Sequence, residues 1–140
     1  KALPGGLILM SPWVDLTESS FERQSWHRGT DYLPVELARK FARAYVPEGA
    51  PGEEVSASNP LASPLKASTQ MLAAFPPTLV LYGEDEALAD QDADFGDMLL
   101  RAKGPNAVKV YGAPDMVHAF PVLYDLGHGS LGQQCVLSLR

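Results

Sequence analysis

Three short apolar runs stand out along the chain, and each is followed by a cluster of turn-forming residues. They cover residues 5–10, 77–82 and 107–112. The first two are nearly all apolar and too short for helices, which predicts strands buried on both faces of a parallel sheet. Residues 88–104 predict a helix, because acidic residues open the segment, apolar residues recur along it and Gly104 ends it. Strand, helix and strand over about 35 residues predict a parallel crossover unit.

The first and second runs lie more than sixty residues apart, which is too far for a simple crossover, so we expect an insertion at about residues 15–75. Within it, residues 33–46 predict a helix that starts near Pro34. One face of this helix carries a stripe of large apolar residues, Leu37, Phe41 and Tyr45. Such a stripe more often packs into a core than binds a ligand. Residues 47–65 are rich in Pro, Gly and Ser and predict irregular structure.

The composition is that of one modest globular domain, with 140 residues of which 46% are apolar and 20% charged. A net charge of −6 without any basic stripe argues against a nucleic-acid partner. No apolar stretch reaches the roughly 20 residues of a membrane-spanning helix. The single cysteine, Cys135, cannot form an intrachain disulfide, and no Cys and His cluster has the spacing of a metal site.

Residues 131–140 predict a closing helix. The sequence starts at Lys1, almost within a predicted strand, which leads us to expect a piece of a longer protein.

Acidic residues follow the second apolar run, in the segment GEDEALADQ at residues 83–91. A helix start favours such charge and makes Asp90 an expected N-cap. Ligands of open α/β sheets, however, bind at the carboxyl ends of the strands, and His118 follows the third run at the same edge. A carboxylate and an imidazole there can meet, leaving one ring nitrogen free as a general base. A lone loop glutamate is more often a capping or solvated side chain, so the hypothesis depends on the pair.

Five motifs occur in a consistent order along nearly the whole chain. They are SPWVDLT at 11–17, DYLP at 31–34, NPLASPL at 59–65, FPPTLVLYGEDEALADQ at 75–91 and GAPDMVHAF at 112–120. Together they resemble the C-terminal half of α/β-hydrolase esterases of the hormone-sensitive-lipase-like family. The resemblance implies an α/β class and a partial α/β-hydrolase fold, in which residues 1–140 form the C-terminal portion of one domain with its last three parallel strands. It also implies a small-molecule acyl ester as substrate and no cofactor.

The same resemblance implies two catalytic side chains. The acid of the family follows the seventh strand in a motif like DPLxD or ExLxD, which here places it on Glu86 and leaves the adjacent Asp85 as an alternative. The histidine falls on His118, which Met116 and Phe120 flank as in the family. In a carboxylic ester hydrolase these two residues would complete a triad of serine, histidine and acid.

Two further motifs of the family, the GxSxG elbow and HGGG, do not occur in the sequence. Ser130, in GHGSLG, lacks the elbow spacing and follows the histidine, so it is a poor candidate nucleophile. We expect the serine to lie before Lys1. The alternative is a catalytically inactive, truncated remnant or a binding fragment of such an esterase. A peptidase or lactone hydrolase of the same fold would share the acid and the histidine.

Other conspicuous residues are interpreted as structural. Trp13 and Asp15 fit a packed aromatic beside a turn-forming aspartate better than a pocket lining. Asp115 follows a proline and fits a turn, and His27 and His128 fit surface positions because neither follows a predicted strand.

Four aromatic residues near or within the insertion would suit an acyl chain better than a charged substrate, namely Trp13, Trp26, Phe41 and Tyr45.

Overall fold

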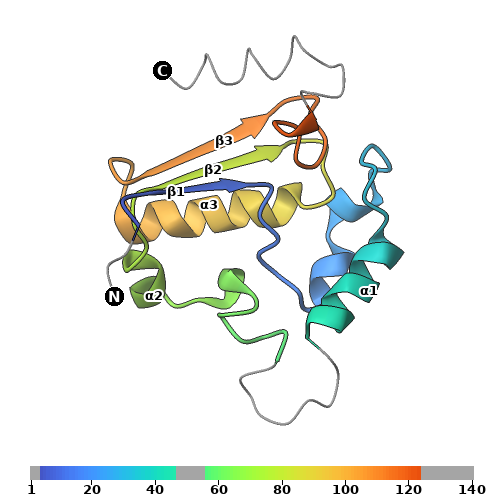
Figure 1. Ribbon diagram of the computed structural model, residues 1–140, viewed down its shortest axis with the longest axis horizontal. Helices are drawn as coiled ribbons and strands as arrows, with labels where there is room; N and C mark the ends of the chain where they lie inside the picture. The colour runs from blue at the N-terminus through green and yellow to red at the C-terminus, as the bar shows by residue number, and fades with distance from the viewer. Residues whose placement is uncertain (1–3, 47–55, 124–140) are drawn as a thin grey trace.

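The computed structural model describes residues 4–46 and 56–123 of the chain. A parallel sheet of three strands lies at the centre of this part, in the order β1-β2-β3 (Figure 1). The strands are β1 (Leu7–Met10), β2 (Thr78–Gly83) and β3 (Val108–Ala113). Each matches a predicted strand, so the expected parallel arrangement is confirmed.

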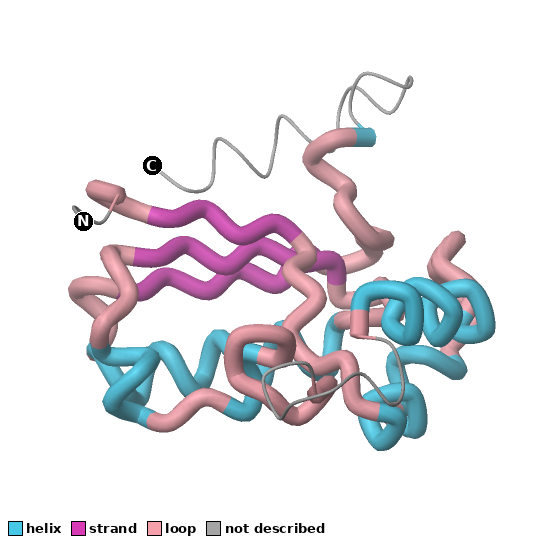
Figure 2. The backbone as a smooth tube through the Cα atoms, turned by 60° about the horizontal axis from the view of Figure 1, so that its bottom comes forward, coloured by secondary structure: helices cyan, strands magenta, loops and turns pink. Residues whose placement is uncertain are grey.

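The helix α3 (Ala89–Lys103) connects β2 to β3 and lies against one face of the sheet (Figures 1 and 2). Its bounds agree with the prediction, and Gly104 ends it with a φ of 79°, a left-handed conformation that costs glycine little. The helix approaches the sheet closely at Gly96, where an added Cβ would lie 2.8 Å from the side chain of Val110. The crossover unit is therefore packed tightly enough to fix where β2 and β3 end.

The main core lies between this helix and the sheet. It is formed by apolar side chains of the strands, of α3 and of the short helix α2 (Thr69–Ala73), which include Val80, Val108, Phe95, Leu99 and Leu72. Each of these five side chains is at most 1% exposed. Burial of a side chain of this size contributes about 1.5–3 kcal/mol, so this layer is the main source of stability for the strands that carry the acid and the histidine.

Strand β1 differs from its prediction. We expected it to be buried on both faces, but Ile8 and Met10 are 67% and 47% exposed, while Leu9 packs against the main core. The reason is that the helices of the described part of the chain cover only one face of the sheet (Figure 2). In β2, by contrast, the adjacent Val80 and Leu81 are both buried, although they point to opposite faces.

The predicted insertion contains helices that lie beyond the carboxyl ends of the strands (Figures 1 and 2). They are η1 (Glu18–Glu22), η2 (Gln24–His27) and α1 (Val35–Tyr45). Their buried side chains, which include Phe21, Trp26, Ala38 and Ala42, form a second core together with Leu88. Leu88 precedes α3, so the second core packs directly against the segment between β2 and α3.

Helix α1 corrects a prediction about its buried face. The stripe of Leu37, Phe41 and Tyr45 is exposed, with Phe41 at 53% and Tyr45 at 70%. The helix instead buries Ala38 and Ala42, which lie one turn apart. Small side chains let the helix backbone approach the aromatic side chains of the second core (the aromatic cluster) closely, so the large apolar residues face outward.

The end of the insertion is short and irregular. Residues 56–63 contain no helix or strand, as the composition predicted, but the short helix η4 (Pro64–Lys66) begins within the last two residues of the segment predicted to be irregular. Residues 47–55, the predicted closing helix at 131–140, and the residues His128, Ser130 and Cys135 lie outside the described part of the chain. Among the described helices, none has the length and apolar character needed to cross a membrane.

Candidate active site

Glu86 lies in a tight turn directly after β2. The turn is closed by a hydrogen bond from the Glu86 N–H to the Gly83 carbonyl, and the Gly83 N–H donates back to Glu86 Oε2 at 2.7 Å. The side chain is completely buried. A charged-group hydrogen bond of this kind is worth about 1.5–3 kcal/mol, so the local backbone holds the carboxylate in one orientation.

His118 lies in the loop after β3, residues 114–120, which we call the histidine loop. This loop is joined to the acid loop, residues 84–88, by the Asp85 N–H, which donates to the Met116 carbonyl at 3.0 Å. His118 Nδ1 lies 3.4 Å from Glu86 Oε1. With a proton on Nδ1 the imidazole donates to the carboxylate and its Nε2 is free to accept a proton. The structure thus brings together the two side chains that the sequence analysis paired.

Ser11, which follows β1, links the same two loops and was not identified from the sequence. Its hydroxyl donates to Glu86 Oε2 at 2.6 Å and accepts from the Ala119 N–H at 2.9 Å. The serine is buried, with 5% of its surface exposed. One hydroxyl therefore holds both the carboxylate and the backbone next to the histidine. The motif SPWVDLT contains the residue, but its spacing gave no indication that Ser11 reaches Glu86.

Asp31 is a second residue that the sequence analysis missed. Its Oδ2 accepts from the Ala87 N–H at 2.8 Å, and its Oδ1 accepts from the His118 N–H at 3.3 Å and from the Tyr32 N–H at 2.8 Å. The carboxylate therefore joins the acid loop to the histidine loop from the side of the insertion. Its place in the motif DYLP, in the loop that precedes the predicted helix at 33–46, was the available signal.

Tyr32 contacts the histidine loop next to Asp31. Its hydroxyl donates to the His118 carbonyl at 3.0 Å, and its ring lies edge-on to the imidazole with the centroids 6.1 Å apart. Burial, and then the negative charges of Asp31 and Glu86, raise the pKa of Tyr32. The phenol therefore remains a hydrogen-bond donor across the neutral pH range.

Backbone strain is concentrated at this site. Among the described residues other than glycine, three have a left-handed backbone, namely Ser11 (φ 45°), Asp115 (φ 59°) and Ala119 (φ 53°). Ser11 and Ala119 are bonded to each other, and Asp115 lies in the histidine loop, where it forms part of the predicted turn. Such conformations cost of order 1–3 kcal/mol each and persist only where surrounding contacts enforce them. The contacts made by Ser11 and Asp31 supply that enforcement here.

The other acids of the segment 83–91 have different environments. No hydrogen bond joins the Asp85 side chain to His118 in the described structure, and the Asp85 backbone carbonyl accepts from Thr30. The prediction that Asp90 is an N-cap is wrong, because the N-cap is Leu88, without a side-chain bond. Asp90 instead accepts from the Ser25 N–H at 2.8 Å and so ties η2 to α3. The helix enters straight from the turn, which leaves no extended capping position for Asp90.

The structural interpretation of the motif after β1 agrees with the geometry for Asp15, whereas Trp13 both packs against the second core and lines the apolar pocket described below. The Trp13 ring packs edge-on against Phe21, with centroids 6.2 Å apart. Asp15 is buried and accepts from the Thr17 N–H and hydroxyl, which forms the predicted turn. Burial alone would raise the pKa of Asp15, but the hydrogen bond from Lys66 and those from Thr17 outweigh it and lower the pKa. His27, predicted to be a surface residue, is exposed.

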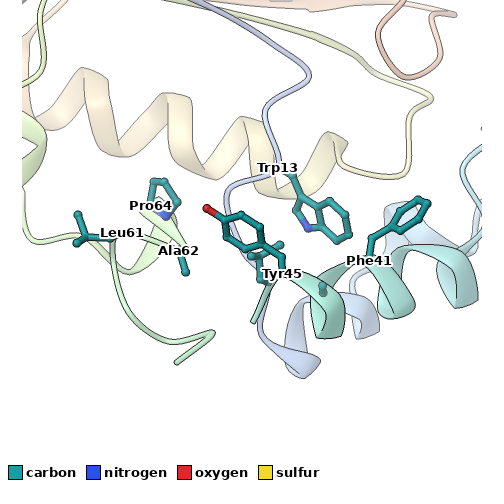
Figure 3. Close-up of a pocket in the computed structure, with 8 residues that line it drawn as sticks. Trp13, Phe41, Tyr45, Leu61, Ala62 and Pro64 are labelled. Atoms are coloured by element: carbon teal, nitrogen blue, oxygen red, sulfur yellow. The ribbon is translucent and has the colours of Figure 1, made fainter. Parts of the chain in front are cut away.

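An apolar pocket of about 460 Å³ lies on the insertion side (Figure 3). Its walls include Trp13, Phe41, Tyr45, Leu61, Ala62 and Pro64. Phe41 and Tyr45 of the exposed α1 stripe thus line this pocket, and with Trp13 they are three of the four aromatic residues expected to suit an acyl chain. The fourth, Trp26, is buried in the second core. Neither Glu86 nor His118 belongs to its lining.

Comparison with known proteins places the chain in a family. A family model for the alpha/beta hydrolase fold matches residues 1–122, and the chain belongs to this family. An esterase of Acinetobacter venetianus is 30% identical over 111 residues, which are 79% of this chain and 34% of the relative.

Solved structures agree with the fold. An esterase/lipase from an uncultured bacterium is 27% identical with a TM-score of 0.70, and the match covers 98% of this chain and 41% of the other. Carboxyl esterase 2 of Tuber melanosporum is 23% identical with a TM-score of 0.74, covering 96% and 41%. The predicted membership among α/β-hydrolase esterases and the predicted partial α/β-hydrolase fold are confirmed. The chain spans between a third and about two fifths of the length of these relatives.

Proposed function

We propose that the protein is a carboxylic ester hydrolase that acts through a triad of serine, histidine and acid, in which His118 is the base and Glu86 the acid. The observation that carries the proposal is the Glu86–His118 pair, held at the carboxyl ends of adjacent parallel strands with Nδ1 toward the carboxylate. Matches to esterases support the choice of an ester as the substrate class. The substrate is expected to be a small acyl ester, and the mechanism needs no cofactor.

The proposed chemistry follows from which nitrogen of His118 is free. A serine hydroxyl attacks the ester carbonyl while Nε2 takes its proton, and the imidazolium then gives that proton to the departing alcohol. Water, activated by the same nitrogen, hydrolyses the acyl-enzyme and restores the serine. Glu86 holds the ring and stabilises the imidazolium in both steps. We expect the serine and the oxyanion donors to come from residues outside these 140, because the sequence contains neither GxSxG nor HGGG.

Hydrolysis of p-nitrophenyl butyrate by the complete protein tests the proposal. His118→Ala should lower kcat by about 10³-fold or more, because the residues of such a triad act as a unit. His27→Ala is the matched control, since His27 is exposed and outside the site, and it should retain full activity. An active His118→Ala variant would show that the base lies elsewhere.

The absence of the GxSxG elbow and of the HGGG segment from these 140 residues is also what a second candidate, a catalytically inactive binding fragment, would show. The two candidates differ in one measurement. The 140-residue chain purified alone should not hydrolyse the ester under either proposal, whereas a polypeptide that also carries an upstream GxSxG segment should hydrolyse it only under the first. Binding of the ester without turnover by that longer polypeptide would favour the second.

A further inference from the structure

Asp92 is a carboxyl group for which the proposed mechanism has no use. It lies in α3, where its N–H donates to the Leu88 carbonyl at 3.0 Å. Its side chain is completely buried, and neither of its oxygens has a hydrogen-bond partner among the described residues. A carboxylate in such a place would lose its hydration with nothing in exchange. The environment therefore favours the neutral acid.

The charge that acts on Asp92 comes from Glu86, which is equally buried. Burial first, and the Glu86 carboxylate second, raise the pKa of Asp92 well above its ordinary value of 3.8. Tyr82 of β2 also interacts electrostatically with Asp92, and it carries no positive charge that could stabilise an ionised Asp92. The amino end of α3 favours an anion, but a helix terminus compensates for less than the hydration lost by a fully buried carboxylate.

Glu86 has room for one more hydrogen-bond donor. Its two oxygens accept from Ser11, from the Gly83 N–H and from His118. An ionised carboxylate offers about four acceptor positions, so one remains open. Asp92 and Glu86 are close enough for their side chains to interact, although not in the geometry of a fully formed bond.

We propose that Asp92 is a protonated positioning residue, which donates its carboxyl hydrogen to Glu86 and leaves Glu86 as the only negative charge of the pair beside His118. Two neighbouring buried carboxyls cannot both ionise cheaply, and the proton stays on the one with fewer donors. Glu86 has three donors and Asp92 has none among the described residues. The meaning for catalysis rests on the proposed function, but the protonation of Asp92 does not.

A protonated Asp92 makes stability depend on pH in a defined direction. In the unfolded chain the residue titrates near its ordinary value of 3.8, whereas the folded protein keeps the proton to higher pH. Between the two values the folded state binds one more proton than the unfolded state, so stability falls as the pH rises. The contribution of this one residue is an increase of about tenfold in the unfolding constant for each pH unit.

Asp92→Asn in the complete protein tests this, because an amide keeps the shape and a donor but cannot titrate. Denaturant unfolding at pH values increasing from about 4 should show the ratio of the wild-type unfolding constant to that of the variant rising, by about tenfold per pH unit as long as folded Asp92 keeps its proton. The matched control is Asp97→Asn, an exposed acid of the same helix, which should follow the wild type. A ratio that does not change with pH would overturn the proposal.

A second measurement needs no variant. With 13C-labelled aspartate, the Asp92 carboxyl resonance about one pH unit above the ordinary pKa of 3.8 should have the chemical shift of a protonated acid, and the shift of an ionised carboxylate would overturn the proposal. Neither of these measurements depends on ester hydrolysis, so they stand even if the proposed function fails.

The positioning role has its own readouts in the complete protein. Asp92→Leu removes the donor and should lower kcat about tenfold at unchanged KM, whereas an unchanged kcat would refute the role. Asp92→Asn should leave the pH at which the His118 ring titrates by NMR in place, because no charge is removed. A downward move would show that Asp92 had been ionised.

Discussion

The Ser11 hydroxyl offers the sharpest perturbation of the proposed site. Ser11→Ala removes the 2.6 Å bond to Glu86 Oε2 and leaves the Ala119 N–H without its partner. The carboxylate loses one of three donors, and the histidine loop loses its tie to β1. Glu86 should then sample other orientations, and fewer molecules should hold His118 ready to accept a proton.

The size of the effect follows from the type of bond. A hydrogen bond to a charged group contributes about 1.5–3 kcal/mol, which corresponds to roughly 10–150-fold in rate if all of it is lost at the transition state. The Gly83 N–H still holds the same oxygen at 2.7 Å, so part of the orientation survives. We therefore expect the lower end, a fall of about tenfold in kcat with little change in KM.

The assay is steady-state hydrolysis of p-nitrophenyl butyrate by the complete protein, together with denaturant unfolding. Ser63→Ala is the matched control, because Ser63 is also buried and also makes two hydrogen bonds, with the Leu16 N–H and the Ala57 carbonyl, away from the pair. It should lose about 1–2 kcal/mol of stability and keep its kcat. Ser11→Gly, which relieves the φ of 45°, should be as slow as Ser11→Ala.

Retention of at least half of the wild-type kcat by Ser11→Ala would refute the reasoning. A Ser11→Gly variant as fast as the wild type would also contradict it, because the backbone conformation and not the hydroxyl would then be responsible. Equal losses of kcat in Ser11→Ala and Ser63→Ala would point to general destabilisation.

Three further substitutions have defined outcomes. Asp31→Ala should lower kcat, and it should lower the unfolding free energy by about 1–3 kcal/mol, because both the acid loop and the histidine loop lose hydrogen bonds to Asp31. Steady-state kinetics and denaturant unfolding measure the two effects, and an unchanged kcat would contradict the prediction. Gly83→Ala should cost at least about 2 kcal/mol in unfolding free energy, since its Cβ would lie 2.1 Å from the Met116 carbonyl oxygen, and a loss below 1 kcal/mol would count against the packing. Lys66→Met should destabilise by about 2 kcal/mol at pH 7, because the buried Asp15 carboxylate keeps its bonds from Thr17 but loses its only ion-pair partner among the described residues. Because the pKa of Asp15 is lowered in the folded protein, the ionised carboxylate stabilises the fold above about pH 3.8, and this stabilisation is lost as the pH falls further. The loss of unfolding free energy caused by Lys66→Met should therefore be smaller in unfolding experiments near pH 3.

The parts of the fold that depend on neighbours in sequence could be predicted. Strand β2, helix α3 and strand β3 form one crossover, and their apolar pattern and Gly104 define them without reference to distant residues. The proximity of Glu86 and His118 then follows from topology, because both follow adjacent parallel strands at the same edge.

The buried faces of β1 and α1 could not be predicted in the same way. Which face of an element is buried depends on what packs against it. Helix α1 carries two faces that could pack, and the aromatic cluster of the insertion selects the small residues Ala38 and Ala42 over the large stripe. In β1 the apolar pattern is uniform, so nothing in it distinguishes the covered Leu9 from the exposed Ile8.

Polar residues that support the site from distant segments are the hardest to find in a sequence. Ser11 reaches Glu86 across 75 residues, and Asp31 reaches His118 across 87. No local pattern records such a contact. Asp92 shows the converse, because its position near a helix start predicts a solvated acid favoured by the helix dipole, whereas the packing of α3 on the sheet buries it next to Glu86.

A double-mutant cycle of Glu86→Gln and His118→Ala in the complete protein tests most directly whether the two residues act together in ester hydrolysis. If Glu86 works only through the imidazole, the double variant should be no slower than His118→Ala alone, so the two losses in kcat should be strongly non-additive. Losses that multiply, each variant slowing hydrolysis of p-nitrophenyl butyrate independently of the other, would contradict the proposed partnership of Glu86 and His118.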